Sequence, residues 1–220
     1  MWYDYTMRRI SLAIATSAIM AALALSPPAS PPEQWRDAIA HTVRVECDRG
    51  GGTGVPVECV PLLDGRWSIV ILTAKHVVVG EDLSLWWIST PERVYGVPTL
   101  MAEHPTADAA LLRIISDEPL NCTPLRFAHP DMGEQVWVIG FPSMSPHRVI
   151  TDGWVGGEGV ASAEVFPGNS GGPVVDSSGH LVGIVVTVGV HGHPMDPKFI
   201  HHDMGFLPLG AIQEWLVSNL

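Results

Sequence analysis

Short apolar stretches separated by turn residues run through most of the chain. Thr42–Cys47 and Val55–Pro61 alternate between apolar and polar residues, which predicts two half-buried strands. Asp48–Gly52 lies between them and predicts a turn. Ser68–Leu72 is almost continuously apolar, which predicts a strand buried on both faces.

The same patterns predict further strands along the rest of the chain. These are residues 83–88, 93–101, 109–115, 135–139, 147–153, 160–165, 172–175, 181–190 and 205–208. Ser116–Pro124 holds two prolines and predicts a link between two halves. Two sets of about six strands predict an all-β fold of two antiparallel six-stranded β-barrels, the first at about 42–120 and the second at about 125–208.

Helical spacing occurs near the two ends of this region. Pro32–Ala40 starts with proline, has acids in its early turns and places Trp35 and Ile39 four residues apart, which predicts a short N-terminal helix. Leu209–Leu220 has apolar residues at helical spacing and predicts a closing amphipathic helix.

The first 25 residues have the pattern of an export signal. Arg8 and Arg9 precede the weakly polar to apolar run Ile10–Leu25, which is short for a spanning helix, and Ala22–Ala24 fits a cleavage site. We expect residues 1–25 to be a signal peptide or an uncleaved membrane anchor, residues 26–32 a proline-rich tether, and residues 33–220 an exported domain, periplasmic or secreted.

Composition and net charge limit the kinds of molecule that the protein is expected to bind. The chain has 220 residues, of which 46% are hydrophobic, so it can bury a substantial core. Its net charge is −11 and it has no basic stripe, which argues against nucleic acid and anionic lipid surfaces. Membrane contact is expected only through an uncleaved N-terminal anchor.

Three cysteines leave the disulfide pattern open. An exported protein permits disulfides, and Cys47 and Cys59 lie symmetrically about Thr53 on the predicted arms of a hairpin. A Cys47–Cys59 bridge is one alternative, two free thiols the other. In both cases Cys122 is expected to be a small buried or loop residue.

The residues Phe166–Asp176 carry the strongest chemical signal. Three glycines and two prolines surround Ser170, so a substrate oxygen could approach the amides of Gly168 and Ser170 closely. A hydroxyl beside two converging N–H groups suits acyl transfer, because it provides a nucleophile and an oxyanion hole. A plain turn serine is the alternative.

Two further residues complete an ordered set. His76 follows a predicted apolar strand, and Asp108 stands at the head of another. Taken singly, each also fits a surface histidine or a turn cap. The three surrounding blocks resemble the signatures of trypsin-like serine proteases, closest to the HtrA/Deg-type branch; they are Thr73–Val78, Asp108–Ile114 and Gly168–Pro173.

The resemblance covers about residues 42–218 and implies a double β-barrel with its site between the barrels. It implies that Ser170 is the nucleophile, that His76 is the general base and then the acid, and that Asp108 fixes the imidazole tautomer. Gly168 and Ser170 would supply the oxyanion hole. No metal or cofactor is implied, and the partners would be protein or peptide substrates.

The sequence departs from the resemblance at two places. Trypsin-like zymogens carry an aspartate before the serine, but this chain has Asn169 and no Ile-Val-Gly-Gly start. We therefore expect activity without clipping near the N-terminus. HtrA-type proteases usually carry a PDZ domain after the protease, and we expect none because the sequence ends at Leu220.

Specificity is read from two segments. Leu181–Val188 resembles the strand that lines the primary substrate pocket, through Val186, Thr187 and Val188. Val188 replaces a familiar glycine, which favours small or aliphatic substrate side chains. Glu164 falls six residues before the serine, where basic-specific relatives place an acid, and it offers the alternative of Arg/Lys selection.

Two alternatives remain: a metal site, and a protein on the same fold without catalytic activity. His191–His193 and His201–His202 contain metal-ligating side chains, but we expect a surface loop without a metal, since metal sites need fixed geometry. The expected function is an exported serine endopeptidase. The alternative is a catalytically silent protein-binding module on the same fold.

Overall fold

The structure is a computed structural model, and it describes residues 42–47, 50–78, 86–91, 93–143, 145–193 and 196–220. The side chains of Cys47, Trp86 and residues 187–203 lie outside the description. The expected N-terminal segment, tether and helix at Pro32–Ala40 also lie outside the described residues. None of the described helices is long and apolar enough to cross a membrane.

Seven antiparallel strands form the first sheet. In the order of the sheet they are β5 (Arg93–Gly96), β4 (Trp86–Thr90), β1 (Val43–Cys47), β2 (Gly50–Pro61), β3 (Trp67–Thr73), β7 (Ala110–Ser116) and β6 (Thr99–Glu103). The stretch 93–101, expected as one strand, divides around Pro98 because proline cannot donate a ladder hydrogen bond. The sheet therefore has one strand more than expected and is open, although β5 lies close to β7.

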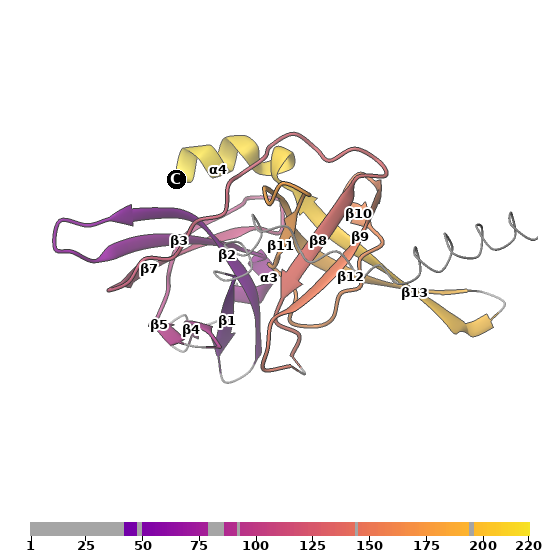
Figure 1. Ribbon diagram of the computed structural model, residues 1–220, viewed down its shortest axis with the longest axis horizontal. Coiled ribbons are helices and arrows are strands. Elements are labelled where there is room, and N and C mark those ends of the chain that lie inside the picture. The colour runs from indigo at the N-terminus through magenta and orange to yellow at the C-terminus, as the bar shows by residue number, and fades with distance from the viewer. Residues whose placement is uncertain (1–41, 48–49, 79–85, 92, 144, 194–195) are drawn as a thin grey trace, which may run out of the picture. The chain divides into compact units, whose positions relative to one another are not determined.

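Six strands form a closed barrel, as the sequence predicts for the second half. Around the barrel they are β10 (Val160–Ala161), β13 (Asp196–Pro208), β12 (Leu181–His193), β11 (Pro173–Val175), β8 (Gln135–Gly140) and β9 (Val149–Gly157). The all-β, chymotrypsin-like fold class is thus confirmed. In Figure 1 the first sheet, from indigo to magenta, lies beside the closed barrel, from orange to yellow.

The strand β13 is much longer than the expected Gly205–Pro208. It pairs with β12 up to His193, and His191 lies opposite His201. The histidines at 191, 193, 201 and 202 therefore lie on paired strands, and the expectation of a surface loop there is wrong. Glycine and histidine hid the strand pattern, because neither has the strong strand preference of a β-branched residue.

One apolar cluster joins the two sheets. It combines Val55, Leu72 and Leu111 of the first sheet with buried residues of the closed barrel, and it includes the C-terminal residues Leu209, Ile212 and Leu216. These last three belong to a 3-10 turn, η2 (Leu209–Ile212), and to the helix α4 (Gln213–Asn219), so the expected closing helix is confirmed. Because both sheets bury side chains in the same cluster, the contact between them is part of the core.

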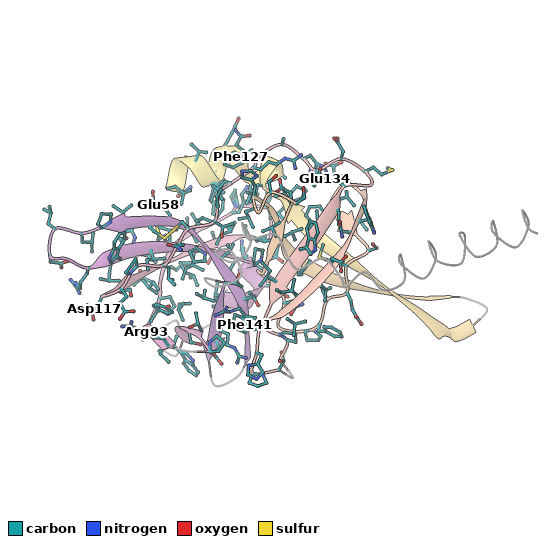
Figure 2. All side chains as sticks on the ribbon, in the orientation of Figure 1. Glu58, Arg93, Asp117, Phe127, Glu134 and Phe141 are labelled. Atoms are coloured by element: carbon teal, nitrogen blue, oxygen red, sulfur yellow. A yellow bond between two sulfur atoms is a disulfide. The ribbon has the colours of Figure 1, made fainter. Side chains whose placement is uncertain are left out.

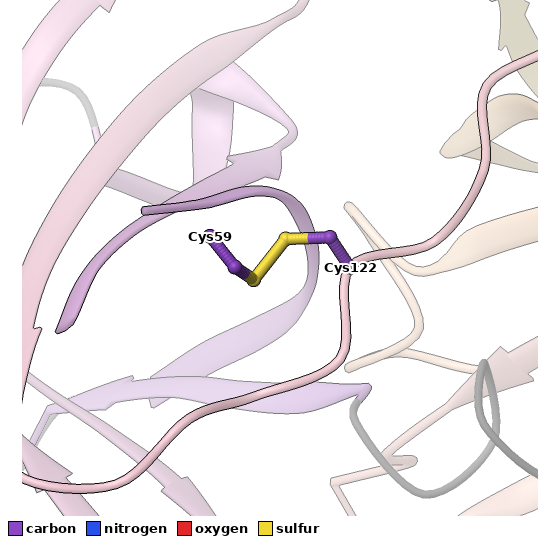
Figure 3. Close-up of a disulfide and its surroundings, with 2 residues drawn as sticks. All are labelled: Cys59 and Cys122. Atoms are coloured by element: carbon purple, nitrogen blue, oxygen red, sulfur yellow. A yellow bond between two sulfur atoms is a disulfide. The ribbon is translucent and has the colours of Figure 1, made fainter. Parts of the chain in front are cut away.

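The disulfide differs from both alternatives. Cys59 is bonded to Cys122, with the two Cα atoms 6.0 Å apart (Figure 3). Cys47 pairs with Gly50 at the start of β2, so nine residues of extended strand, about 30 Å, separate it from Cys59 along β2. A Cys47–Cys59 bridge is excluded by that length, and Cys122 is a bridging residue of the link between the two sheets.

We predict that the Cys59–Cys122 bridge stabilises the fold by closing a 63-residue separation. Replacing both cysteines with alanine should lower the free energy of unfolding by about 2–4 kcal/mol, measured by urea denaturation. A reductant should lower the stability of the native protein to a similar level and leave the double variant unchanged. Equal stability of native protein and double variant under oxidising conditions would contradict this prediction.

Candidate active site

His76 lies at the point where a buried strand ends. Strand β3 leads into the four-residue helix α3 (Lys75–Val78), in which Val77 and Val78 are buried. Burial of these two valines fixes the helix against the core, while the His76 side chain stays 48% exposed. The imidazole is therefore held on a rigid base and remains open to solvent or substrate.

Asp108 lies in the tight loop between β6 and β7. The His104 ring nitrogen Nδ1 accepts hydrogen bonds from the amides of Thr106 and Ala107, at 3.2 and 2.8 Å. The backbone closes the loop through a bond from His104 N to the carbonyl of Ala109, at 2.9 Å. The His104 ring also meets Trp215 of α4 edge-on, 5.2 Å between centroids, so the C-terminal helix supports the loop.

Sheet register brings His76 and Asp108 together. Thr73, the last residue of β3, pairs with Ala110, the first residue of β7. The imidazole Nδ1 then lies 2.6 Å from Asp108 Oδ2, and the backbone N–H of His76 donates to Asp108 Oδ1 at 2.8 Å. An ionised carboxylate only accepts hydrogen bonds, so this contact favours the tautomer with its proton on Nδ1.

Ser170 belongs to the loop between β10 and β11, in the closed barrel. Its carbonyl accepts a 2.8 Å hydrogen bond from the amide of Thr53 in β2. Gly171 follows with a φ of +80°, and a Cβ there would overlap the Thr53 carbonyl and the Thr73 hydroxyl. Only glycine fits this turn, both for its conformation and for its close approach to the first sheet.

Two amides at the site, those of Gly168 and Ser170, have no hydrogen-bond partner among the described residues. The Pro167 carbonyl accepts hydrogen bonds from the amide and hydroxyl of Ser143, at 2.8 and 3.1 Å. In a trans peptide the N–H points opposite the C=O, so the N–H of Gly168 points away from Ser143. Among the described residues, the amides of Gly168 and Ser170 donate no hydrogen bond within the protein.

The loop that contains Ser170 (residues 162–172, here the serine loop) and the helix α3, which contains His76, face each other across the junction of the two sheets. A Cβ on Gly52 would lie 2.7 Å from the Ser170 carbonyl oxygen and 2.8 Å from a methyl group of Val77, the neighbour of His76. Within the described part of the chain, the Ser170 hydroxyl makes no hydrogen bond to the imidazole. Such bonds are often long without substrate and shorten when it binds.

A cavity of about 300 Å³ opens beside Gly168. Its walls come from Gly50–Gly52 and Arg44 of the first sheet, and from Phe141–Ser143 after β8. Phe141 lies at the junction of the two sheets in Figure 2, and the Arg44 guanidinium stacks on its ring at 4.8 Å. Gly168 therefore borders a space large enough for part of a peptide chain.

The residues predicted to line a specificity pocket are placed unequally. Val186 is half-buried and packs against two of the core clusters. Thr187 and Val188 continue β12, and their side chains lie outside the description. Glu164 is exposed, and its carbonyl accepts a 2.6 Å hydrogen bond from the Thr151 hydroxyl.

An ion pair network anchors the turn that follows β11. Burial raises the pKa of Asp176, but hydrogen bonds from the amides of His180 and Ser178 and from Arg126 together bring it below its usual value. Arg126 also bonds Glu134 and holds the pKa of that carboxyl below its ordinary value. Asp176 thus stays charged and fixes the turn behind β11.

Metal ligands are not gathered in the described part of the chain. No three His, Cys, Asp or Glu side chains within it come together in a way that would hold a metal ion. The side chains of His191, His193, His201 and His202 are outside this statement, since the description does not include them.

The family model of the trypsin-like peptidase domain matches residues 52–184. The chain belongs to this family.

The trypsin-like peptidase domain has relatives in bacteria. It is 31% identical over 129 residues to an uncharacterized protein, y4bJ, from Sinorhizobium fredii strain NGR234, which covers 53% of this chain and 20% of the relative. The chain thus spans about a fifth of that protein's length. Among solved structures, the serine endoprotease from Yersinia pestis matches with a TM-score of 0.68 and 23% identity, over 88% of this chain and 67% of that one. That likeness shows the fold.

Three residues that contact the candidate site carried no prediction from sequence. They are Thr53, which bonds the serine loop, Ser143, which orients the Gly168 peptide, and His104, which shapes the Asp108 loop. The sequence does show glycines beside Thr53 and a proline, Pro105, after His104. The hydrogen-bond partners of Thr53 and Ser143, however, are 20 or more residues away, and those of His104 depend on the shape of its loop. Spacing in the sequence therefore does not reveal the roles of these three residues.

We predict that Asp108 determines the tautomer of His76. In Asp108→Asn, an NH₂ group, which donates hydrogen bonds, replaces one of the two carboxylate oxygens that face His76. The imidazole proton should therefore move from Nδ1 to Nε2. Long-range ¹H–¹⁵N NMR of the ring nitrogens measures this directly, with His76→Gln used to assign the signal. Asp152→Asn, which alters only a bond to Gln135, should leave the tautomer unchanged. An unchanged tautomer in Asp108→Asn would refute the assignment.

Proposed function

We propose that this trypsin-like peptidase domain is a serine endopeptidase that cleaves peptide bonds through an acyl-enzyme. The observation that carries the proposal is the meeting of two half-sites. The first sheet supplies the hydrogen-bonded pair His76–Asp108, and the closed barrel supplies Ser170 with two free amides. Membership of the peptidase family supports the same reading.

In the proposed reaction, Ser170 Oγ attacks the carbonyl carbon of the scissile bond while its proton passes to Nε2 of His76. The carbonyl oxygen becomes an oxyanion and accepts hydrogen bonds from the amides of Gly168 and Ser170. Asp108 stays ionised and stabilises the imidazolium. His76 then gives the proton to the leaving amine, and the C–N bond breaks to leave an ester on Ser170.

Water completes the proposed cycle. His76 takes a proton from a water molecule, and the resulting hydroxide attacks the ester carbon at the position that the amine has left. The second oxyanion uses the same two amides. The carboxylic acid product leaves when the C–O bond breaks and His76 returns the proton to Ser170 Oγ, so the enzyme is regenerated.

The proposal extends to specificity, activation and location. Val186 and Val188 would form an apolar wall that favours small or aliphatic side chains of the substrate. The exposed Glu164 is open to water, which weakens its attraction for a basic side chain of the substrate.

Asn169 is buried and carries no charge to pair with a new N-terminal amine, which supports activity without clipping. The N-terminal pattern supports export.

We predict that the protein hydrolyses fluorescently labelled casein. Ser170→Ala and His76→Ala should each reduce the rate by about 10⁴–10⁶-fold, since removing one member of a triad disables the unit. Ser218→Ala is the matched control, because its hydroxyl bonds Trp215 and Asn219 within the terminal helix, and it should keep full activity. Equal rates for native protein and Ser170→Ala would sink the proposal.

We predict that the cleavage profile is independent of Glu164. A peptide library read by mass spectrometry should show cleavage after small or aliphatic residues, with the same profile for the native protein and for Glu164→Gln. A preference for Arg or Lys that disappears in Glu164→Gln would show that the carboxylate, and not the apolar wall, selects the substrate.

A further inference from the structure

Thr53 occupies an unusual place between the two sheets. It belongs to β2 of the first sheet, and none of its surface is exposed. Its amide and its hydroxyl both bond to the serine loop of the closed barrel. The amide donates to the Ser170 carbonyl at 2.8 Å, and the hydroxyl donates to the Gly168 carbonyl at 2.7 Å.

These two bonds help to fix the backbone on which the free amides lie. The Pro167 carbonyl is bonded by Ser143, and the Asn169 carbonyl accepts a 2.8 Å bond from Gly172. With the two bonds of Thr53, each carbonyl from Pro167 to Ser170 has a partner. The loop can then present the amides of Gly168 and Ser170 without a competing carbonyl turned toward the same space.

The hydroxyl of Thr53 also reaches the second loop at the site. It accepts a 3.0 Å hydrogen bond from the amide of Phe141, two residues before Ser143, which orients the Gly168 peptide. A single buried hydroxyl, acting as donor and acceptor at once, therefore ties together both loops that shape the candidate oxyanion hole.

Neighbouring residues hold Thr53 itself. Its carbonyl accepts a 2.8 Å hydrogen bond from the Thr73 hydroxyl, at the end of the strand that leads to His76. The β-branched side chain has few rotamers, which helps to keep the hydroxyl aimed at its two partners. Valine at this position would keep the shape and leave the buried amide of Phe141 and the half-buried carbonyl of Gly168 without this partner, a costly arrangement.

We propose that Thr53 is a positioning residue for the oxyanion hole: through its hydroxyl the first sheet holds the Gly168 and Phe141 loops of the closed barrel in reactive geometry. This role rests on the proposed function. Its expected signature is a loss of kcat with little change in KM, because the interaction acts on the transition state and not on the bound substrate.

The test compares Thr53→Val and Thr53→Ser with the native protein, using p-nitrophenyl butyrate as the substrate. Rates are expressed per reactive serine, counted by titration to completion with a fluorophosphonate. Thr53→Val should lose about 10- to 100-fold in kcat, the scale expected for a misplaced reacting group. Thr53→Ser keeps the hydroxyl and should retain a kcat within about 3-fold of native.

Ser116→Ala is the matched control, since it removes a buried hydroxyl at the end of β7 that accepts a hydrogen bond from the amide of Glu118. It should affect thermal stability and leave kcat per reactive serine close to native. If Thr53→Val does not fold, Thr53→Ala takes its place, because it also lacks the hydroxyl and cannot clash. If neither folds while Ser116→Ala does, Thr53 serves only to dock the sheets and the proposed role is wrong.

Other outcomes separate this role from the proposed function. Native protein that turns over no ester overturns the proposed function, and the role of Thr53 falls with it. Active native protein with an equal kcat in Thr53→Val overturns the positioning role alone. A loss in Thr53→Ser as large as that in Thr53→Val would also contradict it, because the serine hydroxyl can make the same bonds.

Discussion

The contact between the first sheet and the closed barrel is the interaction on which the site depends. His76 and Asp108 lie on one side of it, and Ser170 and Gly168 lie on the other. The contact is partly apolar, through a cluster that both sheets share, and partly polar, through the buried Thr53. Apolar burial favours association without fixing direction, whereas the hydrogen bonds of Thr53 fix how one loop meets the other.

Each half of the site is rigid for a different reason. The His76–Asp108 pair follows from sheet register, because two adjacent antiparallel strands end and begin at the same edge. The serine loop has no such ladder. It is held by carbonyl hydrogen bonds and by the positive φ of Gly171. Packing alone would leave such a glycine-rich loop free to change its peptide orientations.

The sequence predicts the parts of this protein that depend on local pattern. Strand alternation located most strands, and the three signature blocks picked out residues that the structure brings to one junction. The sequence does not predict contacts between residues that lie far apart along the chain. Cys59 bonds Cys122 because β2 runs on past the hairpin and carries Cys59 to the link between the sheets, and Thr53 meets Gly168 across 115 residues. His191 and His201 lie on strands because each supplies the other's pairing partner.

Covalent labelling determines whether Ser170 is an activated nucleophile. The native protein is treated with a fluorophosphonate, which phosphonylates an activated serine hydroxyl, and the adduct is located by mass spectrometry of its peptides. We expect one adduct, on Ser170, that is absent in Ser170→Ala and forms much more slowly in His76→Ala. A folded native protein that remains unlabelled would show that Ser170 is not activated and would favour a silent binding module.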